Sequence, residues 1–177
     1  LKLSGIEAVR SSTPSACRDN IKEALKLIMT STEDDLITFI ANFREQFKKL
    51  PFEQIAFPRS VRGLSTYYDS NTIYRKSTPI HVRGALIYNH MLKKNGLHNK
   101  YPSIGEGEKI KFCFLKVPNV AQSNIISTPG SLPKELDLLD CIDYDTQFEK
   151  SFIDPLQTIL DVLGWHTEKQ VSLEAFF

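Results

Sequence analysis

Residues 32–50 have the sequence TEDDLITFIANFREQFKKL. Apolar side chains recur at spacings of three and four over about four helical turns. They are Leu36, Phe39, Ile40, Phe43, Phe47 and Leu50. Thr32 is followed by three carboxylates, which is typical of a helix N-terminus, and Pro51 ends the pattern. This stretch predicts a long amphipathic helix that buries one face.

A second amphipathic helix is predicted just before it. Ser12 and Thr13 would cap this helix, with Pro14 at its first position. Its apolar face would consist of Ile21, Ala24, Leu25 and Ile28. The two helices together predict a helical hairpin.

The rest of the chain predicts a small β element and more helices. Residues 109–116 are the clearest strand, and 124–128 could pair with them, whereas 1–9 look extended and 52–77 look like a loop with short strands. Further helices are predicted from Thr78 to about Lys94, through Leu136, Leu139 and Ile142, and from Phe148 to Leu163. The predicted fold class is α+β, dominated by helices.

Composition limits the class of protein. With 177 residues, 41% hydrophobic and 24% charged, the chain has the size and composition of one globular domain, or of one domain plus a tail. No apolar run approaches the roughly 18 residues that span a bilayer, so no membrane partner is expected. The 3 cysteines are widely spaced, which argues against a disulfide framework or a structural zinc site and fits a reducing compartment.

Charge is segregated along the sequence. Residues 59–100 contain eight Lys and Arg against one acid, a formal charge of +7, whereas residues 134–177 carry −7. The cations are Arg59, Arg62, Arg75, Lys76, Arg83, Lys93, Lys94 and Lys100. Such a basic segment predicts contact with the phosphate backbone of a nucleic acid. The alternative is a solvated surface on which the signs happen to separate.

The tripeptide Ser-Thr-Pro occurs three times, beginning at Ser12, Ser77 and Ser127. Arg10 precedes the first copy, and Arg75 with Lys76 precedes the second. A helix N-terminus with a cation beside it can bind phosphate. The alternative is that these motifs only start helices.

The last eight residues, QVSLEAFF, carry the most specific motif. In a 3₁₀ turn, Leu173, Phe176 and Phe177 would project together as an apolar plug, with Gln170 at the start of the motif. This octapeptide resembles the box by which replication enzymes bind ring-shaped sliding clamps. The alternative is a terminal segment that folds back on its own domain.

Several stretches together resemble the C-terminal part of a family B DNA polymerase of the kind encoded by T-even-type tailed phages. They are residues 2–14, 79–89, 106–110, 143–144, 149–156 and 171–177, in the order of that family. The resemblance implies the end of a palm at 1–12, a thumb domain at 13–165 and a flexible clamp-binding tail at 166–177. The missing starting Met suggests an excised fragment or one half of a polymerase encoded in two pieces.

A thumb grips primer–template duplex by its backbone, and the resemblance therefore implies a set of DNA-binding candidates. They are Arg10, Ser12, Thr13, Arg59, Ser60, Arg62, Arg75, Lys76, His81, Arg83, Lys93 and Lys94. Arg59, Ser60 and Arg62 are the weaker ones, because residues 59–78 depart from the family. The implied partners are double-stranded DNA, the sliding clamp and the remaining palm, fingers and exonuclease domains, in the cytoplasm of an infected bacterium.

No catalytic or metal site is expected in this chain. Polymerisation in the family needs two palm aspartates that hold Mg²⁺, so this cofactor is implied only for the missing palm. Asp143 and Asp145 are interpreted instead as solvated helix surface, and the isolated chain is expected to be inactive. Two other hypotheses are a clamp-binding adaptor without DNA contact and a small DNA-processing enzyme with an unrecognised site.

Overall fold

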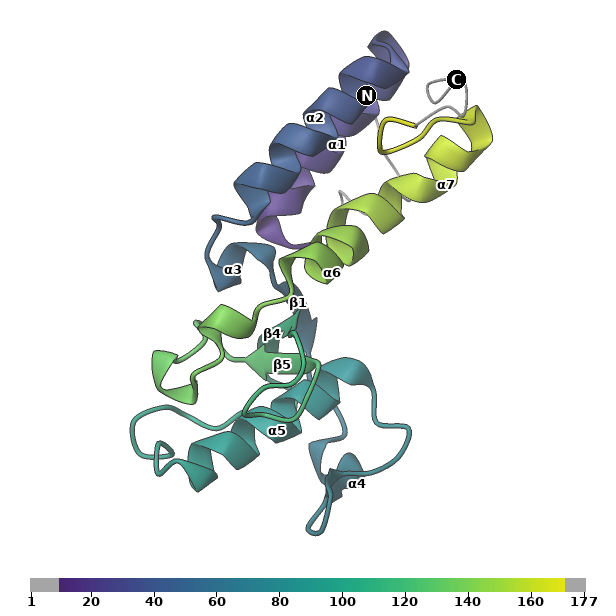
Figure 1. Ribbon diagram of the computed structural model, residues 1–177. Coiled ribbons are helices and arrows are strands. Elements are labelled where there is room, and N and C mark those ends of the chain that lie inside the picture. The colour runs from purple at the N-terminus through teal and green to yellow at the C-terminus, as the bar shows by residue number, and fades with distance from the viewer. Residues whose placement is uncertain (1–9, 171–177) are drawn as a thin grey trace. The chain divides into compact units, whose positions relative to one another are not determined.

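The computed structural model describes residues 10–170 and shows a helix-rich α+β protein with a small sheet and C-terminal helices, as predicted (Figure 1). The chain divides into two compact units. Unit 2 is the continuous segment Pro51–Gln147, and unit 1 combines Leu1–Leu50 with Phe148–Phe177. The predicted extended stretch at 1–9 lies outside the described residues. The proposed division into a domain at 13–165 and a tail at 166–177 stays a prediction.

Unit 1 contains the predicted helical hairpin of α1 (Ser15–Thr30) and α2 (Glu33–Phe47). A reciprocal cap begins α2: the Thr32 side chain accepts a hydrogen bond from the Asp35 N–H (3.2 Å), and the Asp35 carboxylate accepts one from the Thr32 N–H (3.3 Å). The predicted start of α1 is wrong by one residue. Pro14 itself occupies the N-cap position, and no side chain caps the helix.

The C-terminal part of unit 1 packs on this hairpin through phenylalanines. The chain passes through the π-helical turn η4 (Glu149–Ile153) into α7 (Asp154–Leu163), which confirms the predicted C-terminal helix with an irregular first turn. The ring of Phe43 lies 4.8 Å from that of Phe152, and the ring of Phe47 lies 5.2 Å from that of Phe148. The predicted apolar face of α2 therefore forms the core of unit 1.

Unit 2 is built around a three-stranded antiparallel sheet in the order β1-β4-β5. The strands are β1 (Phe57–Ser60), β4 (Lys109–Phe114) and β5 (Ile125–Thr128). The β4–β5 pairing is as predicted. Helix α5 (Ile80–Lys94), also predicted, packs against β5 (Figure 1). Short elements α3 (Phe52–Ile55), α4 (Leu64–Tyr67), β2 (Tyr68–Asp69) and β3 (Ile73–Tyr74) fill the segment expected to be loop with short strands.

The helix predicted through Leu136, Leu139 and Ile142 is wrong. The chain forms two 3₁₀ turns instead, η2 (Lys134–Leu136) and η3 (Leu139–Cys141). Asp137 lies between them with a φ of 57°, a left-handed conformation that interrupts helical hydrogen bonding. A regular helix, α6 (Tyr144–Phe148), follows. Within residues 10–170, no helix combines the length and apolar character needed to cross a bilayer.

Candidate nucleic-acid interface

The N-terminal end of α5 lies beside β1 and brings three predicted residues together. His81, in the first turn of α5, hydrogen-bonds through its ring to the backbone of Ser60 and lies close to Arg59. Its ring packs near that of Phe112, with centroids 6.2 Å apart. Burial first, and then the charge of Arg59, lower the pKa of His81, while the bond to Ser60 acts in the opposite direction. A half-buried imidazole and an exposed guanidinium thus meet at one helix end.

This helix end also presents backbone donors. Pro79 is the N-cap, and the first intrahelical bond runs from the Arg83 N–H to the Pro79 carbonyl (2.9 Å). The N–H groups of the preceding turn therefore have no acceptor within the helix. Arg75 and Lys76 lie in the turn that leads into α5, and both are exposed. The second Ser-Thr-Pro copy therefore starts a helix next to two cations, as the sequence suggested.

Arg83 lies two residues after His81 on α5, and its side chain already contacts other residues of the chain. Its guanidinium donates to the Asn124 side-chain oxygen (2.8 Å) and lies 5.8 Å from the centre of the Tyr74 ring. Arg62 is exposed just after β1. The Gly63 N–H beside it donates to the Glu106 carboxylate at 2.7 Å. Sequence reasoning missed Glu106, a negative charge next to a predicted phosphate ligand, although it lies in one of the family-like stretches.

Lys93 and Lys94 lie at the other end of α5. The helix has 15 residues, a length of about 22 Å at 1.5 Å per residue, so these lysines are far from His81. Cations in the last turn of a helix also interact favourably with its dipole, which gives them a structural role as well. The predicted basic segment is therefore divided between the two ends of α5.

Three predicted residues belong to unit 1. Thr13 is buried, and its carbonyl accepts a hydrogen bond from the Arg18 guanidinium at 3.2 Å. Ser12 is half-buried and Arg10 is exposed. Arg18 is an exposed cation at the start of α1 that sequence reasoning did not single out. Arg10 and Arg18 are the exposed cations next to the first Ser-Thr-Pro copy.

The third Ser-Thr-Pro copy has a structural role. Ser127 and Thr128 are buried in β5, where the Ser127 hydroxyl donates to the His81 carbonyl (2.8 Å) and the Thr128 hydroxyl to the Gly130 carbonyl (2.6 Å). This copy starts no helix. Its serine instead ties β5 to the N-terminal turn of α5 and so helps position His81.

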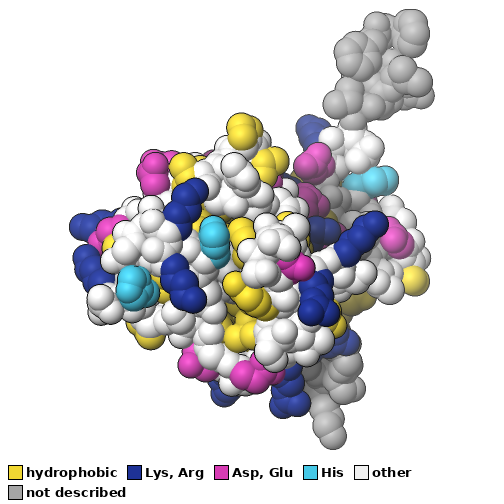
Figure 2. Space-filling view, turned by 90° about the horizontal axis from the view of Figure 1, so that it is seen from below, with side chains coloured by type: hydrophobic (Ala, Val, Ile, Leu, Met, Phe, Trp, Pro, Cys, Tyr) yellow, Lys and Arg dark blue, Asp and Glu magenta, His cyan; other side chains and the backbone are white. Residues whose placement is uncertain are grey.

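Figure 2 shows the lower face of unit 2, where the Lys and Arg side chains are spread around exposed apolar groups. Acidic side chains appear mostly toward the edges of this face. Across this face as a whole the cations are therefore dispersed, and the group at the N-terminal end of α5 is only one part of them. Such a dispersed arrangement suits contacts with successive phosphates of a polyanion better than the binding of one small anion.

Of the predicted clamp-binding motif, only the first residue lies within the described part of the chain. Gln170 is exposed and donates to the Glu168 carbonyl at 3.3 Å. Leu173, Phe176 and Phe177 lie outside the described residues. The segment before the motif contacts α2: the His166 N–H donates to the Glu33 carboxylate (2.9 Å), and Glu168 pairs with Arg44 (3.7 Å).

The interpretation of Asp143 and Asp145 as solvated helix surface needs one correction. Asp143 precedes α6, and its carboxylate accepts hydrogen bonds from the N–H (3.1 Å) and the hydroxyl (2.8 Å) of Thr146. Asp143 is therefore a helix cap, whereas Asp145 is exposed in the first turn. In the described part of the chain, no three His, Cys, Asp or Glu side chains come close enough to hold a metal ion.

Comparison of this sequence with known proteins indicates which family it is related to. No family model matches this sequence. Over 181 residues, the chain is 30% identical to the DNA-directed DNA polymerase of Enterobacteria phage T4, and over 182 residues it is 31% identical to that of Escherichia phage RB69. The chain is homologous to one part of the T-even-type phage DNA polymerases.

Both alignments include 100% of this chain but only 20% of each polymerase. The chain thus spans about one fifth of the length of the relatives it matches. The homology extends over both units and agrees with the family resemblance found from the motifs.

Proposed function

We propose that this chain is the duplex-holding thumb and the clamp-binding tail of a phage-type DNA polymerase. One observation carries the DNA part: Arg59, His81 and the N-terminus of α5 lie together, with Arg75 and Lys76 in the preceding turn. Backbone N–H groups, a helix dipole and full positive charges at one place favour phosphate. The homology to DNA polymerases makes duplex DNA the polyanion that this end of α5 would meet.

Such contacts fix the position of a duplex without reading its sequence. Each phosphate that is neutralised releases counterions, so the logarithm of the affinity falls linearly with the logarithm of the salt concentration, with a slope of about −0.9 per contact. Holding finished duplex in this way would keep the polymerase on its template. Nucleotide transfer would need the palm, fingers and exonuclease domains, either continuous with this chain or on a separate polypeptide.

The binding test is fluorescence anisotropy with a labelled primer–template duplex at several salt concentrations. Arg59→Ala and Lys76→Ala should each weaken binding. Each variant should also make the slope of log affinity against log salt concentration less negative, by about the amount expected for one lost phosphate contact. Lys134→Ala is the matched control, because Lys134 is an exposed cation of unit 2 outside the basic segment. Binding that does not change with salt, or an equal loss in the control, would refute the proposal.

His81 gives the DNA contact a pH dependence. Its lowered pKa keeps the imidazole neutral at neutral pH, and a nearby phosphate would favour the charged form. Duplex binding should therefore take up a proton, and affinity should rise as the pH falls through the pKa of His81 in the complex. His81→Gln should remove this rise while leaving the salt dependence at pH 8 nearly intact. Calorimetry in two buffers of different ionisation enthalpy measures the proton uptake.

The clamp part of the proposal depends on Gln170, Leu173, Phe176 and Phe177. Three apolar side chains entering a pocket on the clamp would stabilise the complex by about 5–8 kcal/mol before the cost of ordering the tail. The double variant Phe176→Ala/Phe177→Ala should abolish clamp binding and leave duplex binding unchanged. A clamp-binding adaptor would behave in the same way at the tail, but Arg59→Ala would then have no effect on DNA.

A further inference from the structure

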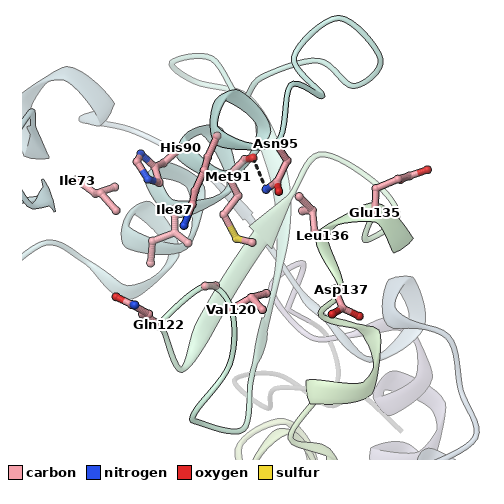
Figure 3. A pocket seen from close by; sticks show the side chains of 12 residues that line it. Ile73, Ile87, His90, Met91, Asn95, Val120, Gln122, Glu135, Leu136 and Asp137 are labelled. Atoms are coloured by element: carbon pink, nitrogen blue, oxygen red, sulfur yellow. Dashed lines mark hydrogen bonds between the residues drawn. The ribbon is translucent and has the colours of Figure 1, made fainter.

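Unit 2 contains a cavity of about 320 Å³ at the C-terminal end of α5 (Figure 3). Its walls come from α5, the loop before β5, β3 and the η2 turn. The lining residues are mixed in character. They include Ile87, Met91, Lys94, Val120, Gln122 and Asp137. This volume lies at the lower end of the roughly 300–1,000 Å³ typical of small-molecule sites.

The middle of the cavity is apolar. In Figure 3 the thioether of Met91 points into the space between α5 and Val120, with Ile87 and Leu136 on either side. Val120 is 54% exposed, so the apolar surface continues to the mouth of the cavity. A thioether packs favourably against an aromatic ring, and the flexible side chain of Met91 can adapt to a flat ligand.

Polar groups of different kinds lie around this centre. Lys94 provides a cation at one wall, with the imidazole of His90 one turn away on α5, and Gln122 and Asp137 provide an amide and a carboxylate at the others. Glu135 also borders the cavity, but its carboxylate accepts hydrogen bonds from Lys100 (2.8 Å) and Tyr101 (2.6 Å). Its charge is therefore already compensated, and the α5 wall keeps a net positive charge.

The backbone around the cavity is unusual. Ile73, Gln122 and Asp137 have φ angles of 74°, 51° and 57°, and all three line it. They are three of the four non-glycine residues with positive φ in the described part of the chain. A positive φ is especially unfavourable for a β-branched residue such as Ile73. Strained backbone tends to persist where a ligand site requires it.

We propose that this cavity binds one unpaired nucleotide. The phosphate would contact Lys94 and His90, and the base would pack against Met91 and Val120. Gln122 and Asp137 would then contact the polar edge of the base. A lysine with an imidazole beside it, apolar side chains and hydrogen-bonding groups thus match the phosphate, the face and the edge of a nucleotide. The site lies at the opposite end of α5 from His81, so the inference does not depend on the proposed duplex contact.

The chain offers a direct probe of occupancy. It contains 2 methionines, Met91 in the cavity and Met29 exposed on α1 in unit 1. With ¹³C-methyl methionine labelling, addition of dTMP should shift the Met91 resonance in a saturable way and leave that of Met29 unchanged. Thymidine, which lacks the phosphate, should bind more weakly. If no nucleotide shifts Met91, the proposal is overturned.

Lys94→Ala should weaken dTMP binding about tenfold, the loss expected for one charge-assisted hydrogen bond. Lys109→Ala is the matched control, because Lys109 is an exposed cation of unit 2 that does not line the cavity. Equal losses in the two variants would overturn the proposal, since they would indicate only general attraction of anions. N-acetyl-leucine amide is a probe for a peptide site. If it shifts the Met91 resonance at least as strongly as dTMP does, the proposal is also overturned.

Two further probes separate the sources of the nucleotide. Oligo(dT) binding more tightly than dTMP would support an unpaired residue of a DNA strand, and equal or weaker binding would support a free nucleotide. Both outcomes are consistent with the proposal, because an unpaired residue of a strand and a free nucleotide present the same phosphate and base to the cavity. A fully paired hairpin duplex should leave Met91 unshifted, and a shift equal to that of oligo(dT) would contradict an unpaired ligand. Failure of duplex binding, in contrast, would affect only the proposed thumb function.

Discussion

Gly84 sets how closely α5 approaches β5. A Cβ built on Gly84 would clash with the Ser127 hydroxyl and lie 2.8 Å from the Ser127 backbone nitrogen and 3.1 Å from the Ile126 carbonyl carbon. Backbone atoms of a paired strand cannot move away at low cost. Gly84→Ala should therefore lower the free energy of unfolding by about 1–3 kcal/mol, even though alanine favours a helix. Urea denaturation followed by circular dichroism measures this change.

Gly130→Ala is the matched control for this prediction. A Cβ on Gly130 would meet no atom within 4 Å, and the residue does not have a positive φ. Its stability should change by less than about 0.5 kcal/mol. A Gly84→Ala variant as stable as this control would mean that α5 does not lie so close to β5.

Glu135 offers a second prediction for a single residue. Its hydrogen bonds with Lys100 and then Tyr101 lower the pKa of this carboxyl from an ordinary 4.5 to about 2. A carboxyl with a lowered pKa stabilises the fold above its unfolded pKa, and this contribution is lost as the pH falls toward the folded value. NMR titration should show Glu135 ionised at pH 3. Lys100→Ala should raise its pKa toward the ordinary value, whereas Lys109→Ala, an exposed cation elsewhere in unit 2, should not.

Sequence alone could not reveal which polar residues of the Ser-Thr-Pro motifs are exposed. The three copies look alike, yet Thr13 and Thr128 are buried and Thr78 is half-buried at the start of α5. Likewise, His81 meets Arg59 only because β1 pairs with β4 next to α5. The sequence could therefore predict which residues are candidates for binding phosphate. It could not predict which of them lie close together, because this depends on strand pairing.

Among the elements, α2 was the most predictable, because its apolar face and its N-terminal capping residues both indicate the same helix. Thr32→Ala removes the side chain that accepts the Asp35 N–H and should lower the free energy of unfolding by about 1 kcal/mol. Thr38→Ala is the control, because Thr38 is exposed in the middle of the same helix. Thermal unfolding of both variants measures the difference. Equal stabilities would show that the cap contributes nothing.

The elements that sequence reasoning placed poorly are short or depend on contacts. Strand β1 has 4 residues and includes Pro58, which is tolerated at the edge position that β1 takes beside β4. The η2 and η3 turns have 3 residues each, too few for a helical period to be distinguished from chance spacing of apolar residues. The periodicity of apolar residues therefore predicts long elements well, but it fails for elements that are only one turn long.

For the whole molecule, the division into two units has a consequence for folding. Unit 2 is continuous in sequence, whereas unit 1 needs segments from both sides of it. The phenylalanine cluster shows this dependence, because Phe43 and Phe47 pack on Phe148 and Phe152. Residues 10–50 expressed alone would leave the apolar face of α2 uncovered.

We therefore expect residues 51–147 to fold on their own and residues 10–50 to remain largely unfolded. Unit 2 keeps its sheet, α5 and the buried Gln147, whose side chain accepts from the Phe114 N–H (3.1 Å) and donates to the Ile55 carbonyl (2.6 Å). Cooperative urea unfolding and slow exchange of the β4 amides would support this expectation. Ending the fragment at residue 146 removes both of these hydrogen bonds, one of them to the buried Ile55 carbonyl, and should destabilise the fragment by about 1–3 kcal/mol. A 51–147 fragment that lacks dispersed amide resonances would show instead that unit 2 requires unit 1 to fold.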